Sequence, residues 1–251
     1  MKVILLSLFQ GGMSPDFNNG LVRFVRICLF DIDGTLLLSG RAGQRAIETV
    51  LRDRYNLTKP VEGINTAGRT DMAILYDLLQ YYEIEPTVER IREFQNFYLE
   101  QLPIELERCP GEVLPGVIDR LEELQDHPDV HLGLLTGNLA RGASLKINHY
   151  RLQHFFTFGS YGDHHINRDD VAREALVDIR QRFGGDVQSE NIWIIGDTPA
   201  DVQCAHAISA RAVAVATGIY STEELAPAEP DVLINDLTEV NLLKVLFGED
   251  D

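Results

Sequence analysis

The feature that most constrains the fold of this chain is a series of short apolar runs alternating with helical segments. Most of the runs are continuously hydrophobic, which is typical of parallel strands buried on both faces of a sheet. The runs are Arg26–Asp31, Val130–Thr136, Phe155–Gly159, Asn191–Gly196, Arg211–Thr217 and Asp231–Ile234. Helical periodicity covers residues 116–126, 139–151, 168–183, 198–208 and 236–247. This alternation predicts an α/β fold with a doubly wound, Rossmann-like parallel sheet and helices on both sides.

One long interval, between the first two predicted strands, breaks the alternation. Residues 44–109 have a helical pattern throughout and contain no strand candidate. Turn-forming glycines and prolines flank the interval at 39–43 and 110–116. We therefore expect residues 1–43 and 110–251 to form the α/β core and residues 44–109 to form an inserted, all-helical cap. Two short linkers beside a strand end would let such a cap move as a lid.

Acidic side chains follow two of the predicted strands directly. Asp31 and Asp33 come after the first run, and Asp197 and Asp201 come after the fourth. Asp33 could cap a turn and Asp197 could cap the next helix. However, the carboxyl ends of parallel strands meet at one edge of a sheet, and carboxylates gathered there would repel one another. A hard divalent cation would join them, and oxygen ligands suit Mg²⁺, so these four residues are the predicted metal ligands.

The second predicted strand ends in Thr136, Gly137 and Asn138, just before a helix. A hydroxyl group and exposed amides at a helix N-terminus can hold an oxyanion or a phosphate. The same pattern is also typical of a simple helix cap.

Three motifs in order carry a family resemblance: DIDGT at 31–35, LLTGN at 134–138 and GDTPAD at 196–201, with a basic residue between the last two. Together they resemble the haloacid dehalogenase-like hydrolase superfamily over about Arg26 to Thr217. A helical cap inserted after the first motif is similar to the subgroup that includes phosphoglycolate phosphatase and β-phosphoglucomutase.

The resemblance implies roles for the four aspartates. Asp31 would be the nucleophile that takes the phosphoryl group. Asp33 would be the general acid and base, and its backbone carbonyl would face the metal. Asp197 would bind Mg²⁺ directly, and Asp201 would support the metal's water ligands or the basic residue. Relatives that break carbon–halogen or carbon–phosphorus bonds lack the second aspartate of the first motif, so Asp33 favours hydrolysis of a phosphate ester.

The resemblance also implies substrate-binding residues. Thr136 and the Gly137 amide would hold phosphoryl oxygens, and Asn138 lies beside them. In capped relatives a loop of the cap reaches into the site, and here Arg69 and Thr70 occupy such a loop. Thr70 could equally cap the helix that follows it.

The sequence departs from the family where a lysine is expected after the third strand. Arg168 stands at about that position, although its planar guanidinium is not equivalent to an ammonium group. Lys146, on the helix after Thr136, is the other candidate, with a solvent-facing lysine as its simpler interpretation. We favour Arg168.

These features predict a Mg²⁺-dependent phosphatase that acts on a small phosphorylated metabolite of the phosphoglycolate or sugar-phosphate type. A phosphomutase would use the same residues, and a non-catalytic phosphate-binding protein or a signalling receiver module are alternatives from other classes. A receiver module is disfavoured because it is typically shorter and has neither the helical insert nor the late GDTPAD motif.

The composition narrows the range of partners. The formal net charge of -17 argues against binding to nucleic acids or to anionic membranes. The chain has 3 cysteines in no metal-binding or disulfide pattern, which favours a reducing, cytoplasmic setting. We expect a monomer or a homodimer, with residues 1–20 as an extra strand or a loose arm.

Overall fold

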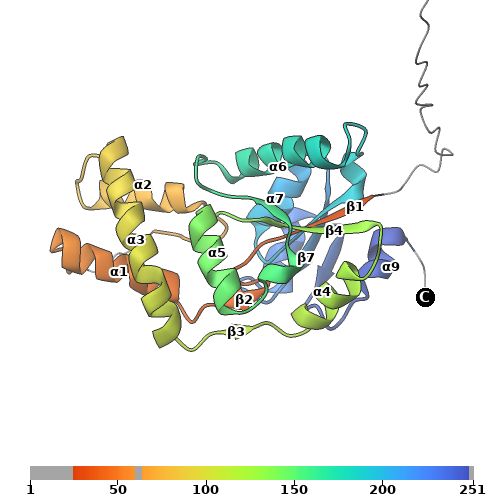
Figure 1. Ribbon diagram of the computed structural model, residues 1–251, viewed down its shortest axis with the longest axis horizontal. Coiled ribbons are helices and arrows are strands. Elements are labelled where there is room, and N and C mark those ends of the chain that lie inside the picture. The colour runs from red at the N-terminus through yellow and green to blue at the C-terminus, as the bar shows by residue number, and fades with distance from the viewer. Residues whose placement is uncertain (1–24, 60–63, 249–251) are drawn as a thin grey trace, which may run out of the picture.

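The computed structural model describes residues 25–59 and 64–248, and Figure 1 shows their arrangement. The predicted arm at residues 1–20 lies outside this range. None of the described helices is both long and apolar enough to cross a membrane.

A six-stranded, entirely parallel sheet forms the centre of the core, in the order β5-β4-β1-β6-β7-β8. The strands are β1 (Arg26–Phe30), β4 (Val130–Leu135), β5 (Phe158–Ser160), β6 (Ile192–Gly196), β7 (Arg211–Val215) and β8 (Val232–Ile234). β1 lies between β4 and β6, so the chain winds away from β1 in both directions. The predicted fold class is confirmed.

Helices cover both faces of the sheet because alternate residues of each strand point to opposite sides. Cys28 and Phe30 of β1 pack in one hydrophobic cluster, whereas Ile27 and Leu29 pack in another. The first cluster includes α4 (Val117–Gln125), α5 (Ala140–His149) and α9 (Leu242–Phe247). The second includes α6 (Arg168–Phe183), α7 (Pro199–Ala207) and α8 (Thr222–Leu225). Short 3-10 turns lie at Gln153–Phe155, Ser189–Asn191 and Ala226–Ala228.

The helical cap stands beside the sheet in Figure 1 and has its own hydrophobic core. It consists of α1 (Ala42–Tyr55), α2 (Asp71–Tyr81) and α3 (Val88–Arg108). Its two connections to the core form a small antiparallel sheet of β2 (Leu37–Leu38) and β3 (Glu112–Val113). Since α1 begins at Ala42, we propose that the cap starts slightly before residue 44.

Two element predictions need correction. The strand predicted at Phe155–Gly159 begins only at Phe158, because Phe155 ends a 3-10 turn and packs in the core. The helix predicted over 236–247 begins only at Leu242, where Asn241 caps it. Phe155 is buried outside the strand, and Leu237 is the one buried residue among 236–241, so hydrophobic periodicity alone extends each element too far.

Candidate active site

Three polar motifs meet where adjacent strands end. β1 pairs with both β4 and β6, so Asp31, Thr136 and Asp197 follow three neighbouring strands at the same edge of the sheet. The strand order reverses at β1, and in open α/β sheets this is where ligands bind. The fold therefore brings the predicted core residues to one place.

Three buried carboxylates form the centre of the site. One oxygen from each of Asp31, Asp197 and Asp201 lies within 4.8 Å of the others. Asp197 Oδ1 accepts a hydrogen bond of 3.0 Å from Thr35. Asp201 accepts from the backbone N–H and hydroxyl of Thr198 at 3.0 and 2.7 Å. Asp201 is thus largely satisfied by protein donors, whereas Asp31 and Asp197 are the less saturated carboxylates.

Arg168, the first residue of α6, is the cation of this cluster. Its guanidinium lies 3.1 Å from Asp31 and 2.5 Å from Asp201, and its side chain is only 7% exposed. It thus lies beside the predicted nucleophile, which is the placement that the resemblance implies for the missing lysine. Its Nε has no hydrogen-bond partner among the described residues.

The electrostatics of the cluster show an excess of negative charge. Burial raises the pKa of Asp31 to about 6, because the attraction of Arg168 only partly offsets desolvation and the neighbouring carboxylates. Burial, with Asp201 and Asp31 nearby, also raises the pKa of Asp197 well above its usual range. A further positive charge would stabilise the ionised forms of both carboxylates.

The residues present fit a bound Mg²⁺ ion. The donor set consists of carboxylate oxygens, which hard cations prefer. Two glycines let the backbone pass close to the Asp197 carboxylate: a Cβ on Gly34 or Gly218 would lie 2.3 or 1.8 Å from Asp197 Oδ2. Gly34 also has a φ of +88°, a conformation that other residues rarely adopt.

Asp33 belongs to a second network rather than to the carboxylate cluster. Its carboxylate accepts from Lys146 Nζ at 2.5 Å and from Asn138 Nδ2 at 2.9 Å. Asn138 also accepts from Lys146 at 2.6 Å and donates to the Thr136 hydroxyl at 2.8 Å. Burial opposes ionisation of Asp33, but the Lys146 ammonium outweighs it and holds the pKa of Asp33 below its usual value. Of the four aspartates predicted to bind the metal, Asp33 is thus the one whose side chain lies outside the carboxylate cluster, so its predicted role depends on the backbone carbonyl that the resemblance implies.

The interpretation of Lys146 as a solvent-facing lysine is wrong. Its side chain is 5% exposed and lies on the inner side of α5, next to the buried Ala143 and Ile147. The structure therefore brings both basic candidates to the site, each beside a different aspartate.

The cap loop at 69–71 touches the loop that follows β4, but mainly through its backbone. The Asp71 N–H donates to the Gly137 carbonyl at 2.7 Å, and a Cβ on Gly137 would lie 2.1 Å from the Arg69 carbonyl. The Arg69 guanidinium pairs instead with Asp77 at 2.6 Å. Thr70 caps α2 and donates to the Ile166 carbonyl at 3.2 Å. Neither side chain shares a hydrogen bond with the predicted catalytic groups in the described part of the chain.

Two residues at the site were not predicted as functional. Asp71, on the cap, accepts a hydrogen bond through its Oδ2 from the Leu139 N–H, at the start of α5, at 2.8 Å. Tyr98, on α3, lies within the cap and is 6% exposed. Its place in a helical pattern is that of an ordinary core residue, so periodicity gave no signal for it.

Comparison with known proteins confirms the resemblance. Residues 28–215 match the family model described as haloacid dehalogenase-like hydrolase. The chain therefore belongs to the haloacid dehalogenase-like hydrolases.

Several relatives align with most of the length of this chain. It is 28% identical to "Probable phosphatase IndB" of Dickeya dadantii, over 85% of this chain and 91% of that protein. It is 24% identical to phosphoglycolate phosphatase 1 of Pseudomonas aeruginosa, over 87% of this chain and 79% of that protein. Among solved structures, CbbY from Rhodobacter sphaeroides in complex with phosphate has a TM-score of 0.67 at 18% identity, covering 86% of this chain and 96% of that one. This last likeness bears on the fold alone.

Proposed function

We propose that this protein is a Mg²⁺-dependent phosphatase that hydrolyses small phosphate monoesters through an aspartyl-phosphate on Asp31. The observation that carries the proposal is the placement of Asp31 beside Arg168 and within the cluster formed with Asp197 and Asp201. The phosphatase names of relatives that cover most of the chain support it.

In the first step the Asp31 carboxylate attacks phosphorus and the ester oxygen leaves. A carboxylate and a phosphate repel each other, so the attack needs nearby positive charge. Arg168 supplies part of it and fixes the orientation of Asp31. Asp31, Asp197 and the Asp33 carbonyl would hold Mg²⁺, with Asp201 supporting its water ligands. When bound, Mg²⁺ supplies the remaining charge that offsets the repulsion between the two anions.

The phosphoryl oxygens would be held by the Thr136 hydroxyl, the Gly137 amide and the Nε of Arg168. The Thr136 hydroxyl is buried and oriented by Asn138. Because these donors are already fixed, they stabilise the charge on the phosphoryl oxygens without having to reorganise. Positioning and charge stabilisation of this kind provide most of the catalysis in phosphoryl transfer.

Asp33 would act as the general acid and base of the reaction. Lys146 and Asn138 fix its carboxylate, which is 38% exposed and therefore open to substrate and water. Because the Lys146 ammonium lowers the pKa of Asp33, its carboxylate would be ionised at neutral pH, as it must be to accept a proton from the water that attacks the aspartyl-phosphate. To protonate the leaving oxygen in the first step, Asp33 must first gain a proton.

We propose further that the substrate is a small metabolite of the phosphoglycolate or sugar-phosphate type and that the enzyme acts in the cytoplasm as a monomer or homodimer. The cap over the site would limit access for large substrates. The three cysteines are all free and buried, which suits a reducing compartment.

A panel of small phosphate monoesters tests the proposed function. We expect release of inorganic phosphate with Mg²⁺ and none with EDTA, restored by adding Mg²⁺ in excess. Release of phosphate, rather than its return to the substrate, also distinguishes hydrolysis from a mutase reaction. Turnover that is unchanged in EDTA would contradict the role of the metal.

A further inference from the structure

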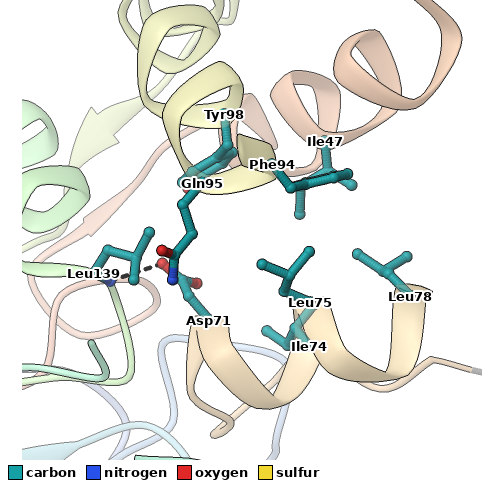
Figure 2. Close-up of a pocket in the computed structure, with 9 residues that line it drawn as sticks. All are labelled: Ile47, Asp71, Ile74, Leu75, Leu78, Phe94, Gln95, Tyr98 and Leu139. Carbon is teal, nitrogen blue, oxygen red and sulfur yellow. Dashed lines mark hydrogen bonds between the residues drawn. The ribbon is translucent and has the colours of Figure 1, made fainter. Parts of the chain in front are cut away.

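A small pocket, partly open to solvent, lies among the three cap helices and reaches the core at Leu139 (Figure 2). Three cap helices and Leu139 of the core line it. The wall is formed mainly by aliphatic and aromatic side chains, including Ile74, Leu75, Leu78 and Phe94.

The cavity adjoins the catalytic network. Asp71 lies on its wall and is hydrogen-bonded to Leu139, the residue after Asn138 (Figure 2). A Cβ built on Gly43 would lie 3.5 Å from the Tyr98 hydroxyl and 4.0 Å from Lys146 Nζ. Tyr98 therefore lies on the cavity wall close to the lysine that holds Asp33. The charge of Asp33 acts on both Asp71 and Tyr98, so both residues lie near the group that would meet the leaving oxygen of an ester bound at Asp31.

Two polar atoms on the wall have capacity left for a ligand. Asp71 uses Oδ2 for the Leu139 N–H, and no donor in the described chain is hydrogen-bonded to its Oδ1. The Tyr98 hydroxyl likewise has no hydrogen-bond partner among the described residues, although the side chain is only 6% exposed. Neither atom is among the fully buried, unpartnered atoms of the described chain, so both remain open to a ligand hydroxyl.

The wall offers no cation to pair with an anion. No lysine, arginine or histidine of the described chain lines the cavity. The nearest cations are already engaged, Lys146 with Asp33 and Asn138 and Arg69 with Asp77. Burial raises the pKa of Asp71 to about 6, so its carboxylate is still mostly ionised at neutral pH and would repel a second carboxylate.

We propose that Asp71 and Tyr98 select phosphate monoesters whose leaving group is uncharged and carries a hydroxyl, and that they disfavour esters with a carboxylate there. This inference rests on the phosphatase function proposed above. Within that function it favours sugar- or polyol-type phosphates over phosphoglycolate.

A matched pair of substrates tests the inference. 2-Hydroxyethyl phosphate and 2-phosphoglycolate differ in having a hydroxymethyl group or a carboxylate at the same position. We expect the wild-type enzyme to favour the former by at least about tenfold in kcat/KM, because a desolvated like charge is costly. Asp71→Asn keeps an acceptor for the Leu139 N–H but removes the charge, so it should reduce this preference by about tenfold, mainly through a lower KM for 2-phosphoglycolate.

Two controls separate selectivity from a general defect. Glu89→Gln makes the same charge change at an exposed position of the cap and should leave the preference unchanged. Tyr98→Phe should lower kcat/KM severalfold for 2-hydroxyethyl phosphate but not for ethyl phosphate, which has no hydroxyl to bind. This second variant also tests the inference if Asp71→Asn does not fold.

The outcomes are distinguishable. A wild-type preference for 2-phosphoglycolate, or a preference that neither Asp71→Asn nor Tyr98→Phe alters, would overturn the inference and leave the phosphatase function standing. Absence of Mg²⁺-dependent release from every ester would overturn both.

Discussion

Replacing Asp31 by asparagine is expected to lower kcat by on the order of 10⁴-fold or more, because the amide cannot form the aspartyl-phosphate. The change is nearly isosteric, so binding of the ester should change much less than turnover. The measurement is phosphate release under saturating substrate and Mg²⁺. Residual activity within a few-fold of the wild type would show that another group attacks phosphorus.

The same variant should be more stable than the wild type when no metal is bound. The pKa of Asp31 is about 6 in the folded chain against an ordinary 3.8, so the ionised form is disfavoured in the fold. A carboxyl group whose pKa is raised by folding stabilises the fold at pH values below its ordinary pKa. This stabilisation is lost as the pH rises through about 6. In EDTA at about pH 7.5, Asp31→Asn should therefore raise the free energy of unfolding by on the order of 1–3 kcal/mol.

The pH dependence supplies the control for that effect. The advantage of Asp31→Asn should shrink as the pH falls from about 7.5 to about 5, because the wild-type carboxyl then becomes protonated. Thermal melting of both proteins in EDTA at the two pH values measures it. An advantage that grows toward acid pH would contradict the assigned direction of the pKa shift.

Replacing Arg168 by methionine is the second change with a large expected effect. It removes the cation that lies against Asp31 and Asp201, leaving two buried carboxylates without their partner. Breaking a buried ion pair from one side typically costs about 3–5 kcal/mol. We therefore expect a loss of that order in the free energy of unfolding in EDTA, and loss of turnover even when Mg²⁺ is present.

Arg173 provides a matched control on the same helix. It pairs with Asp170, but both side chains are about half exposed, at 53% and 46%. An exposed pair contributes about 0–1 kcal/mol, so Arg173→Met should be nearly neutral. Arg168→Lys keeps the charge without the planar fork and should be less damaging than Arg168→Met. Equal effects of the two methionine variants would contradict the assignment of Arg168 to the site.

The sequence allowed prediction of those site residues whose placement follows from the sheet itself. Asp31, Thr136 and Asp197 each follow a continuous apolar run, and the carboxyl ends of adjacent parallel strands must meet. Arg168 lies at the start of a helix after a short strand, and its pairing with Asp31 agrees with the position that the resemblance implied.

Residues that depend on packing between distant segments could not be predicted in this way. Lys146 is buried because Asp33, 113 residues away in sequence, offers a carboxylate on the inner side of α5. A lysine in a helical pattern normally indicates an exposed position. Similarly, Asp71 caps a helix that follows it by 68 residues, and a cap of this kind leaves no local spacing to detect. The arrangement of cap and core determines both residues.

The central claim is that a phosphoryl group is transferred to Asp31, and acid quenching during turnover tests it most directly. The enzyme would be mixed with Mg²⁺ and excess substrate, quenched in acid within the first turnovers, digested and analysed by mass spectrometry, with Asp31→Asn in parallel. The account predicts one phosphoryl group on the peptide that contains Asp31 and none in the variant. A phosphoryl group on a different residue, or phosphate release by the wild type with no phosphorylated peptide under conditions where release is slow, would contradict it.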